Sequence, residues 1–232
     1  MIENNVQVRQ TINALEDIRT EINSFNGKSL FDLRDVRTHF PNQLNKVLIC
    51  TSLNLYNHNN NLWNKQSCDE ILYTPTRGDH YQILQAYQIS VKNYLIYSLS
   101  SILEAFYRNI LNKLDNTEYV KKNFHFVKTN IFERLNLNKD GDSWKGISIL
   151  SNIRNTIHNN GVHTSGDIVI SNYHNNGAHF TKGMIHYNAT FEMLTWICQD
   201  IFKNYLEIIG SPCMQKVPLI ESMYNDPFDF DG

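Results

Sequence analysis

The chain has 232 residues, of which 41% are hydrophobic and 12% aromatic, which is enough for one sizeable core or two small ones. A net charge of −2 excludes a broad basic surface that would hold long nucleic acids by counterion release, so any contact with nucleic acid must be local. The four cysteines include no C-x-x-C pair, which argues against a zinc module and against a disulfide framework.

No stretch of the sequence reaches the roughly 18 apolar residues that a membrane-spanning helix needs. The first residues also lack the basic region and the apolar run of a secretory signal. We therefore expect a soluble, cytoplasmic protein with reduced thiols and without a membrane partner.

Helical periodicity dominates the first part of the chain. Apolar residues at steps of three and four predict an amphipathic helix over 4–26. A second helix is expected from Pro41, in its first turn, to about Tyr56, followed by an Asn-rich loop. Asparagine clusters of this kind are typical of turns, because Asn tolerates a left-handed backbone.

A long helix is predicted next, with Asp79 as its N-cap and Leu114 near its end. A helix of this length is unusual in a small domain, and we expect a bend near 98–101. Its many aromatic residues are expected to pack in the core rather than to stack on nucleic acid bases.

Shorter elements fill the rest of the chain. One or two short helices are expected within 117–137, and a helix capped by Ser143 carries apolar residues from Trp144 to Ile157. Two β-like runs within about 167–187, joined by an Asn-Gly turn, predict a hairpin. Thr190 is expected to cap a final amphipathic helix that ends at Gly210.

Together these elements predict a mainly α fold, a helical bundle with a long central helix and a β-hairpin between the last two main helices. Residues 1–78 are expected to form a helical extension packed on the core. Residues 79–210 are expected to form the main helical domain, and 211–232 a C-terminal tail with aromatic and acidic residues.

The most informative segment is 153–161, Ile-Arg-Asn-Thr-Ile-His-Asn-Asn-Gly. Arg154 and His158 are four residues apart, so on a helix they are neighbours on one face, off the apolar stripe. Asn155 flanks this face, and Gly161 suits the left-handed position that ends a helix. A fixed cation beside a titratable imidazole suits chemistry on a phosphodiester, although a His at a helix C-terminus also stabilises the helix dipole.

The long helix with the segment 100–110, followed by Trp144 and the segment 153–161, resembles the HEPN superfamily. Its members are helical proteins, commonly dimeric, found among toxins, phage-defence systems and RNA-processing enzymes. Catalytic members carry an Arg, often followed by Asn, and a His further along. Here only three residues separate Arg154 from His158, one fewer than the usual minimum. The tyrosine that one toxin branch has two residues after the His is absent here.

The resemblance implies a metal-independent endoribonuclease without a cofactor, in which a homodimer places two copies of the motif around one phosphate of single-stranded RNA. Arg154 and His158 would be catalytic, with Asn155 donating to phosphate or orienting the His. Glu104 matches an acidic position on the neighbouring helix and would support Arg154. The resemblance also allows an antitoxin or a defence-system protein as a partner.

Other candidate residues have structural alternatives. Lys121 and Lys122 lie in a short basic and aromatic run that suits single-stranded RNA, although such an isolated run is more often a solvated helix face. A zinc site among the histidines is disfavoured, because their spacing is not that of a metal motif and no cysteine joins them. Two functions therefore remain open: the ribonuclease, and a non-catalytic HEPN-like module that binds a nucleotide, RNA or a protein.

Overall fold

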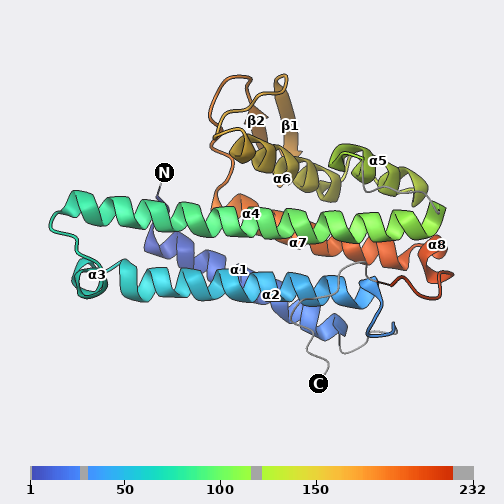
Figure 1. Ribbon diagram of the computed structural model, residues 1–232, viewed down its shortest axis with the longest axis horizontal. Helices are drawn as coiled ribbons and strands as arrows, with labels where there is room; N and C mark the ends of the chain where they lie inside the picture. The colour runs from blue at the N-terminus through green and yellow to red at the C-terminus, as the bar shows by residue number, and fades with distance from the viewer. Residues whose placement is uncertain (1, 27–30, 116–121, 222–232) are drawn as a thin grey trace.

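The computed structural model describes residues 2–26, 31–115 and 122–221 (Figure 1). Within these ranges the chain forms α-helices, one π-helical turn and one antiparallel pair of strands. They are α1 (Asn5–Asn26), α2 (Val36–Asn57), the π-helix η1 (His58–Leu62), α3 (Lys65–Ile71), α4 (Arg77–Asp115), α5 (Phe124–Arg134), α6 (Asp142–His158), β1 (Ile168–Tyr173), β2 (Asn176–Phe180), α7 (Phe191–Gly210) and α8 (Pro212–Gln215). The predicted helical bundle with a hairpin between its last two main helices is confirmed.

The central element is α4, whose 39 residues extend for about 58 Å at 1.5 Å per residue. It begins at Arg77, so Asp79 lies inside its first turn and is not the N-cap that the sequence predicts. Thr76 and Asp79 form a capping box, in which each side chain accepts a hydrogen bond from the backbone N–H of the other. The helix is unbroken across 98–101, where a bend was expected, and Figure 1 shows it running the length of the molecule.

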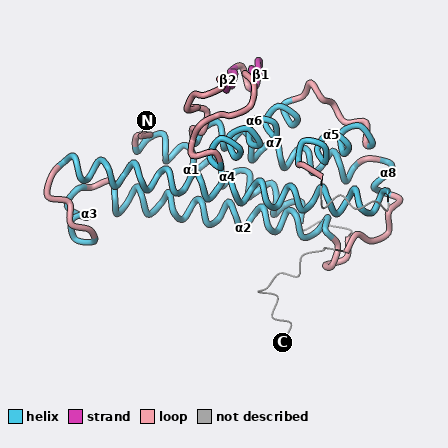
Figure 2. Tube along the Cα trace, turned by 45° about the horizontal axis from the view of Figure 1, so that its top comes forward, coloured by secondary structure: helices cyan, strands magenta, loops and turns pink. Residues whose placement is uncertain are grey.

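The other long helices lie around α4. Figure 1 shows α1 and α2 along one side of it, α5 and α6 along the other, and α7 behind it. Figure 2 shows the hairpin on the side of α6 and away from α2. One continuous hydrophobic core joins residues of both ends of the chain, from Val8 on α1 to Ile208 on α7.

The start of α2 differs from the prediction. The helix begins at Val36 with Asp35 as its N-cap, so Pro41 lies inside it rather than in its first turn. A proline there cannot donate to the carbonyl one turn back, which belongs to Arg37. The hydroxyl of Tyr205 on α7 donates to that carbonyl at 2.5 Å and so replaces the missing partner.

Asp35 and Arg37 form an ion pair whose side chains are both 1% exposed. The Arg37 guanidinium also donates to the carbonyls of Met214, Val217 and Pro218 at 2.9, 3.0 and 3.2 Å. Asp35 accepts from the N–H of Ile220 at 3.1 Å. This pair therefore fastens the end of the described chain to the start of α2.

The second half follows the predicted order with shifted boundaries. Helix α6 begins at Asp142 after Gly141, so Ser143 lies inside its first turn and is not the cap. The second strand spans only Asn176–Phe180, because the chain after Phe180 turns away and makes a single bridge, between Val162 and Ile185. Thr190 caps α7 as predicted, accepting from the N–H of Met193 at 3.1 Å.

Candidate functional site

Arg154 and His158 lie in the last turns of α6, whose opposite face is buried. Ile147, Leu150 and Ile153 are at most 1% exposed and pack in the main core. That apolar stripe fixes the rotation of the helix and so directs the polar face outward. The Arg154 side chain is 32% exposed, and His158 is exposed.

The end of α6 matches the sequence prediction. The helix ends at His158, and both Asn160 and Gly161 have positive φ, of 57° and 84°. The N–H of Gly161 donates to the carbonyl of Thr156 at 2.9 Å, which closes the last turn. His158 is thus the final helical residue, with the chain turning sharply away behind it.

The Glu104 carboxylate on α4 joins two arginines. Its Oε2 accepts from Nη1 of Arg154 at 3.3 Å, and its Oε1 accepts from Nη2 of Arg108 at 2.5 Å. Arg108 also donates to the backbone carbonyl of Lys122 at 2.8 Å. The structure therefore brings Glu104 to Arg154 from a helix 50 residues away and adds a second guanidinium.

His158 contacts Tyr97, which lies on α4 two turns before Glu104. The rings meet edge to face, with centroids 5.2 Å apart and an interplanar angle of 70°. Neither ring nitrogen of His158 has a hydrogen-bond partner among the described residues. The imidazole is therefore held by an aromatic contact while both nitrogens can exchange protons with a ligand or with water.

The remaining predicted site residues lie apart from this centre or outside the described ranges. Asn155 is exposed, and its side chain makes no hydrogen bond to His158. Lys122 is exposed, with Nζ 5.4 Å from the centroid of the Phe126 ring, and reaches the centre only through its carbonyl and Arg108. Lys121 lies outside the described residues.

Polar side chains at the end of α6 and in the segment that leads to the hairpin lie close together. Thr156 is buried, and its hydroxyl lies 3.4 Å from Nδ1 of His163, whose Nε2 is 3.0 Å from the carbonyl of Gly166. Burial lowers the pKa of the neighbouring His186, and the nearby His163 lowers it further. These imidazoles are part of the packing under the hairpin and are not directed at Arg154.

A second polar cluster holds the tip of the hairpin. Asp200 on α7 is fully buried, and its Oδ2 receives the Tyr173 hydroxyl at 2.8 Å and lies 2.9 Å from Nε2 of His174. His174 also stacks on Trp196, with ring centroids 5.1 Å apart. Burial raises the pKa of Tyr173 well above its usual value, and the Asp200 carboxylate raises it further.

Sequence reasoning missed three of these residues. Arg108 could have been found, because it follows Glu104 at the spacing of a helical ion pair. Tyr97 belongs to an aromatic run that was assigned to the core. Asp200 could not be found, since nothing near it in the sequence indicates that Tyr173 and His174 fold back onto it.

Metal binding has no support from the described residues. Among them, no group of three or more His, Cys, Asp or Glu side chains could hold a metal ion. The same part of the chain contains no helix with both the length and the apolar character needed to cross a membrane.

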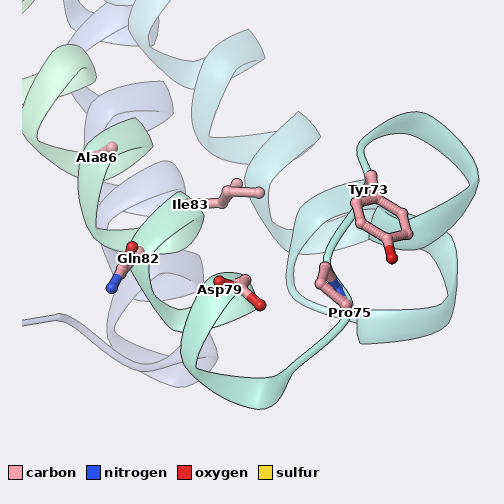
Figure 3. A pocket seen from close by; sticks show the side chains of 6 residues that line it. All are labelled: Tyr73, Pro75, Asp79, Gln82, Ile83 and Ala86. Carbon is pink, nitrogen blue, oxygen red and sulfur yellow. The ribbon is translucent and has the colours of Figure 1, made fainter.

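Two pockets lie near the opposite end of α4. One, of about 510 Å³, is lined by Tyr73, Pro75, Asp79 and Ile83 among others, between the start of α4 and the loop before it (Figure 3). A second of similar volume adjoins it and shares Ile83 and Ala86. Ile83 is 21 residues from Glu104 along α4, about 32 Å at 1.5 Å per residue, so these pockets are separate from the arginine and histidine centre.

Comparison of the chain with protein-family models, with curated proteins and with solved structures gave no match. The function must therefore be argued from the side chains themselves. One carboxylate holds two guanidinium groups, and an exposed imidazole lies one turn beyond Arg154 at the end of the same helix. Such a group can bind a phosphate through guanidinium forks and transfer protons through the imidazole.

Proposed function

We propose that this protein is a metal-independent endoribonuclease of the HEPN type, with Arg154 and His158 in its active site. The supporting observation is the pairing of a guanidinium fixed by Glu104 with an imidazole whose two nitrogens have no partner among the described residues. A structural histidine at a helix end would be expected to donate to a carbonyl or a carboxylate. His158 instead has only the edge of Tyr97.

The proposed reaction uses the 2′-hydroxyl of RNA as the nucleophile. One imidazole removes the hydroxyl proton as the 2′-oxygen forms a bond to phosphorus. The bond from phosphorus to the 5′-oxygen breaks, and an imidazolium donates a proton to that leaving oxygen. The products are a 2′,3′-cyclic phosphate and a 5′-hydroxyl, and guanidinium groups stabilise the charge that develops on the phosphate.

A homodimer supplies the second imidazole that this scheme needs. Each chain offers one exposed imidazole in the motif, and one group cannot be base and acid in the same step without an intervening proton exchange. A two-fold axis beside the end of α6 would place His158 and Arg154 of both protomers around one phosphate. The toxin or phage-defence role, the cytoplasmic location and an antitoxin or defence-system partner belong to this proposal.

The test is cleavage of labelled single-stranded RNA in EDTA by the wild type and by the Arg154→Ala and His158→Ala variants. His179→Ala is a matched control, because His179 is an exposed histidine on β2, away from the proposed site. We expect wild type and control to produce 2′,3′-cyclic phosphate ends, and both motif variants to be inactive with unchanged circular dichroism. Equal cleavage by all four proteins would disprove the proposal.

The non-catalytic module is the second candidate, and one observation favours it. Arg154 is already engaged by Glu104 at 3.3 Å, so in this arrangement part of its guanidinium is occupied by a carboxylate. A protein that only binds RNA or a partner would retain this pair. It would bind RNA without turnover, and His158→Ala would leave the affinity unchanged.

A further inference from the structure

The two pockets near the start of α4 are successive parts of one groove. The first is lined on α4 by Asp79, Gln82, Ile83 and Ala86, and the second by Ile83, Ala86, Tyr87 and Ser90. Each residue of the second set follows one of the first set by four positions. Four residues of an α-helix rise about 6 Å, so the pockets are repeated one helical turn apart along α4.

The wall opposite α4 is formed by the end of α3 and the loop that follows it. Ile71 and Leu72 line the second pocket, and Tyr73 and Pro75 line the first. Figure 3 shows Ile83 directed from α4 towards this loop. Ile71, Leu72 and Tyr73 are 60%, 42% and 89% exposed. Exposed apolar residues gathered in this way are typical of an interaction site.

The wall is fixed to the rest of the molecule. Lys65 on α3 donates to the carbonyl of Thr74 at 2.6 Å, and Nε2 of His80 on α4 lies 2.7 Å from the carbonyl of Leu62. A small hydrophobic cluster of η1, α3 and α4 includes Leu62 and Cys68. Because the groove is already formed, little conformational entropy is lost when it binds a partner.

One carboxylate gives the groove its polarity. Among the described residues that line the two pockets, only Asp79 carries a charge. Hydrogen bonds from the hydroxyl and the backbone N–H of Thr76 hold the pKa of Asp79 below its usual value. Nearby, Lys65 is paired with Asp69 at 2.6 Å, and Arg77 is exposed at the start of α4. The first pocket therefore presents a negative charge, and the second presents a mainly apolar surface.

We propose that this groove binds an amphipathic helix of a partner protein. A Lys or Arg of that helix occupies the first pocket, where it pairs with Asp79 beside the Tyr73 ring. A bulky apolar residue four positions away occupies the second pocket and packs on Leu72 and Tyr87. The inference is independent of the proposed ribonuclease, because Ile83 is about 32 Å from Glu104 along α4.

A helix fits this groove better than an extended peptide does. Residues four apart on a helix are separated by about 6 Å along its axis, which is the repeat of the pockets. An extended peptide could match this repeat with every second residue, but it also needs backbone hydrogen-bond partners. The walls on α3 and α4 are helical, so most of their backbone groups are already paired.

The experiment is a selection from a phage-displayed library of helical peptides against the full chain, followed by Kd measurements on the enriched peptides by fluorescence anisotropy. Ala86→Arg obstructs both pockets, because Ala86 is exposed and lines both. Thr20→Arg is the matched control, since it adds the same charge at an exposed position of α1. Asp79→Asn removes the charge but keeps an oxygen that can accept from the Thr76 N–H. Circular dichroism and urea unfolding check that each variant folds.

We expect the enriched peptides to carry a Lys or Arg four positions from a bulky apolar residue. Ala86→Arg should raise their Kd about 10-fold or more, because it fills the centre of the groove. Asp79→Asn should raise Kd about 2- to 5-fold, the range of one exposed ion pair, and this difference should shrink at high salt. Thr20→Arg should bind the peptides as the wild type does.

The inference is overturned by a selection that enriches no peptide, by enriched peptides without a basic residue, or by a Kd for Ala86→Arg within about 2-fold of the wild type. Light scattering after size exclusion tests the other occupant, a second copy of this chain. If Ala86→Arg converted a wild-type dimer into a monomer, the groove would be an interface between copies and the partner helix would be rejected. An oligomeric state that Ala86→Arg leaves unchanged, together with the expected loss of peptide affinity, would support the partner helix.

Discussion

At the scale of single residues, two ion pairs of this protein show how burial decides the contribution of a charge. Glu104 and Arg154 are 23% and 32% exposed, and water screens their attraction. Asp35 and Arg37 are each 1% exposed, and every polar contact they make is with protein. The first pair can therefore open for a ligand, whereas the second has a purely structural role.

We predict that Glu104→Gln lowers the free energy of unfolding by at most about 1 kcal/mol, because the pair is partly solvated. Asp35→Asn should lower it by roughly 3–5 kcal/mol, because the substitution leaves the Arg37 charge buried without its partner. Urea unfolding followed by circular dichroism measures both. Equal losses for the two variants would contradict this account of burial.

Gly146 on α6 is a second residue whose role follows from its surroundings. A Cβ at this position would lie 2.8 Å from the hydroxyl oxygen of Tyr173, which is held in place by its hydrogen bond to Asp200. Neither the ring nor the helix can move away easily, because Tyr173 is fully buried. The glycine is required by close packing and not by its backbone conformation.

Gly146→Ala should therefore lower the free energy of unfolding by about 1–3 kcal/mol through overpacking. The same substitution in a Tyr173→Phe background should lower the free energy of unfolding by less, because Phe lacks the hydroxyl oxygen that lies nearest to the added Cβ. A double-mutant cycle by thermal or urea unfolding measures this coupling. Additive effects of the two substitutions would show that the clash is not the cause.

At the scale of elements, α5 is held against α6 by a lysine. Lys128 is 3% exposed, its Nζ lies 3.6 Å from the centroid of the Trp144 ring, and it donates to the Ser148 hydroxyl at 2.5 Å. Burial, together with the charge of the nearby Lys139, lowers the pKa of Lys128 to about 8. A lysine charged at neutral pH is therefore present in the contact between two helices, and no carboxylate of the described residues pairs with it.

We predict that Lys128→Met does not lower the free energy of unfolding at pH 7 and raises it by up to about 3 kcal/mol. Ser148 keeps a partner, because its hydroxyl donates to the carbonyl of Trp144 at 2.7 Å. The folded-state pKa, about 8, lies below the unfolded value of 10.5, so the unfolded chain binds more protons between these values. The free energy of unfolding of the wild type should therefore increase relative to that of the variant as the pH rises from 8 towards 10. A stability difference that is constant with pH would contradict this.

The elements were largely predictable from the sequence because the apolar residues of α1, α4, α6 and α7 repeat at helical spacing. The errors fell where a tertiary contact overrode a local rule. Pro41 fits inside α2 only because Tyr205 supplies a hydrogen bond from another helix. The second strand ends early because the chain turns away after Phe180.

The candidate site was less predictable than the fold. The neighbouring positions of Arg154 and His158 follow from their spacing on one helix. The contact of Arg154 with Glu104 depends on the packing of α6 against α4, which no local pattern specifies. The roles assigned to Asn155 and Lys122 remain predictions, because neither side chain makes a hydrogen bond or ion pair with His158 or Arg154 among the described residues.

At the scale of the whole molecule, the proposed function requires two copies of the chain. The exposed face around the end of α6 and the middle of α4 includes Tyr97, which is 36% exposed. Apolar and aromatic groups of this kind are common at the centre of protein interfaces. The dimer interface would then include the proposed active site around Arg154 and His158.

We predict a dimer of about 54 kDa, twice the 27.1 kDa of one chain, by light scattering after size exclusion. Tyr97→Arg should yield a monomer and abolish RNA cleavage together, because charges on both copies would face each other across the axis. Tyr187→Arg is the control, as Tyr187 is 83% exposed on the loop after the hairpin. A monomeric wild type that still cleaves RNA would reject the shared site.

The hydrogen bonds from Arg37 to the carbonyls of Met214, Val217 and Pro218 also bear on the order in which the chain folds during synthesis. Arg37 and Met214 are separated by 177 positions, so α2 emerges from the ribosome long before its guanidinium can find its acceptors. Until these acceptors have been made, the Arg37 guanidinium must remain in water. The start of α2 therefore cannot pack against α7 before that point. Such long-range contacts slow folding, because the buried contacts of Arg37 cannot form until residues 214–218 have reached it.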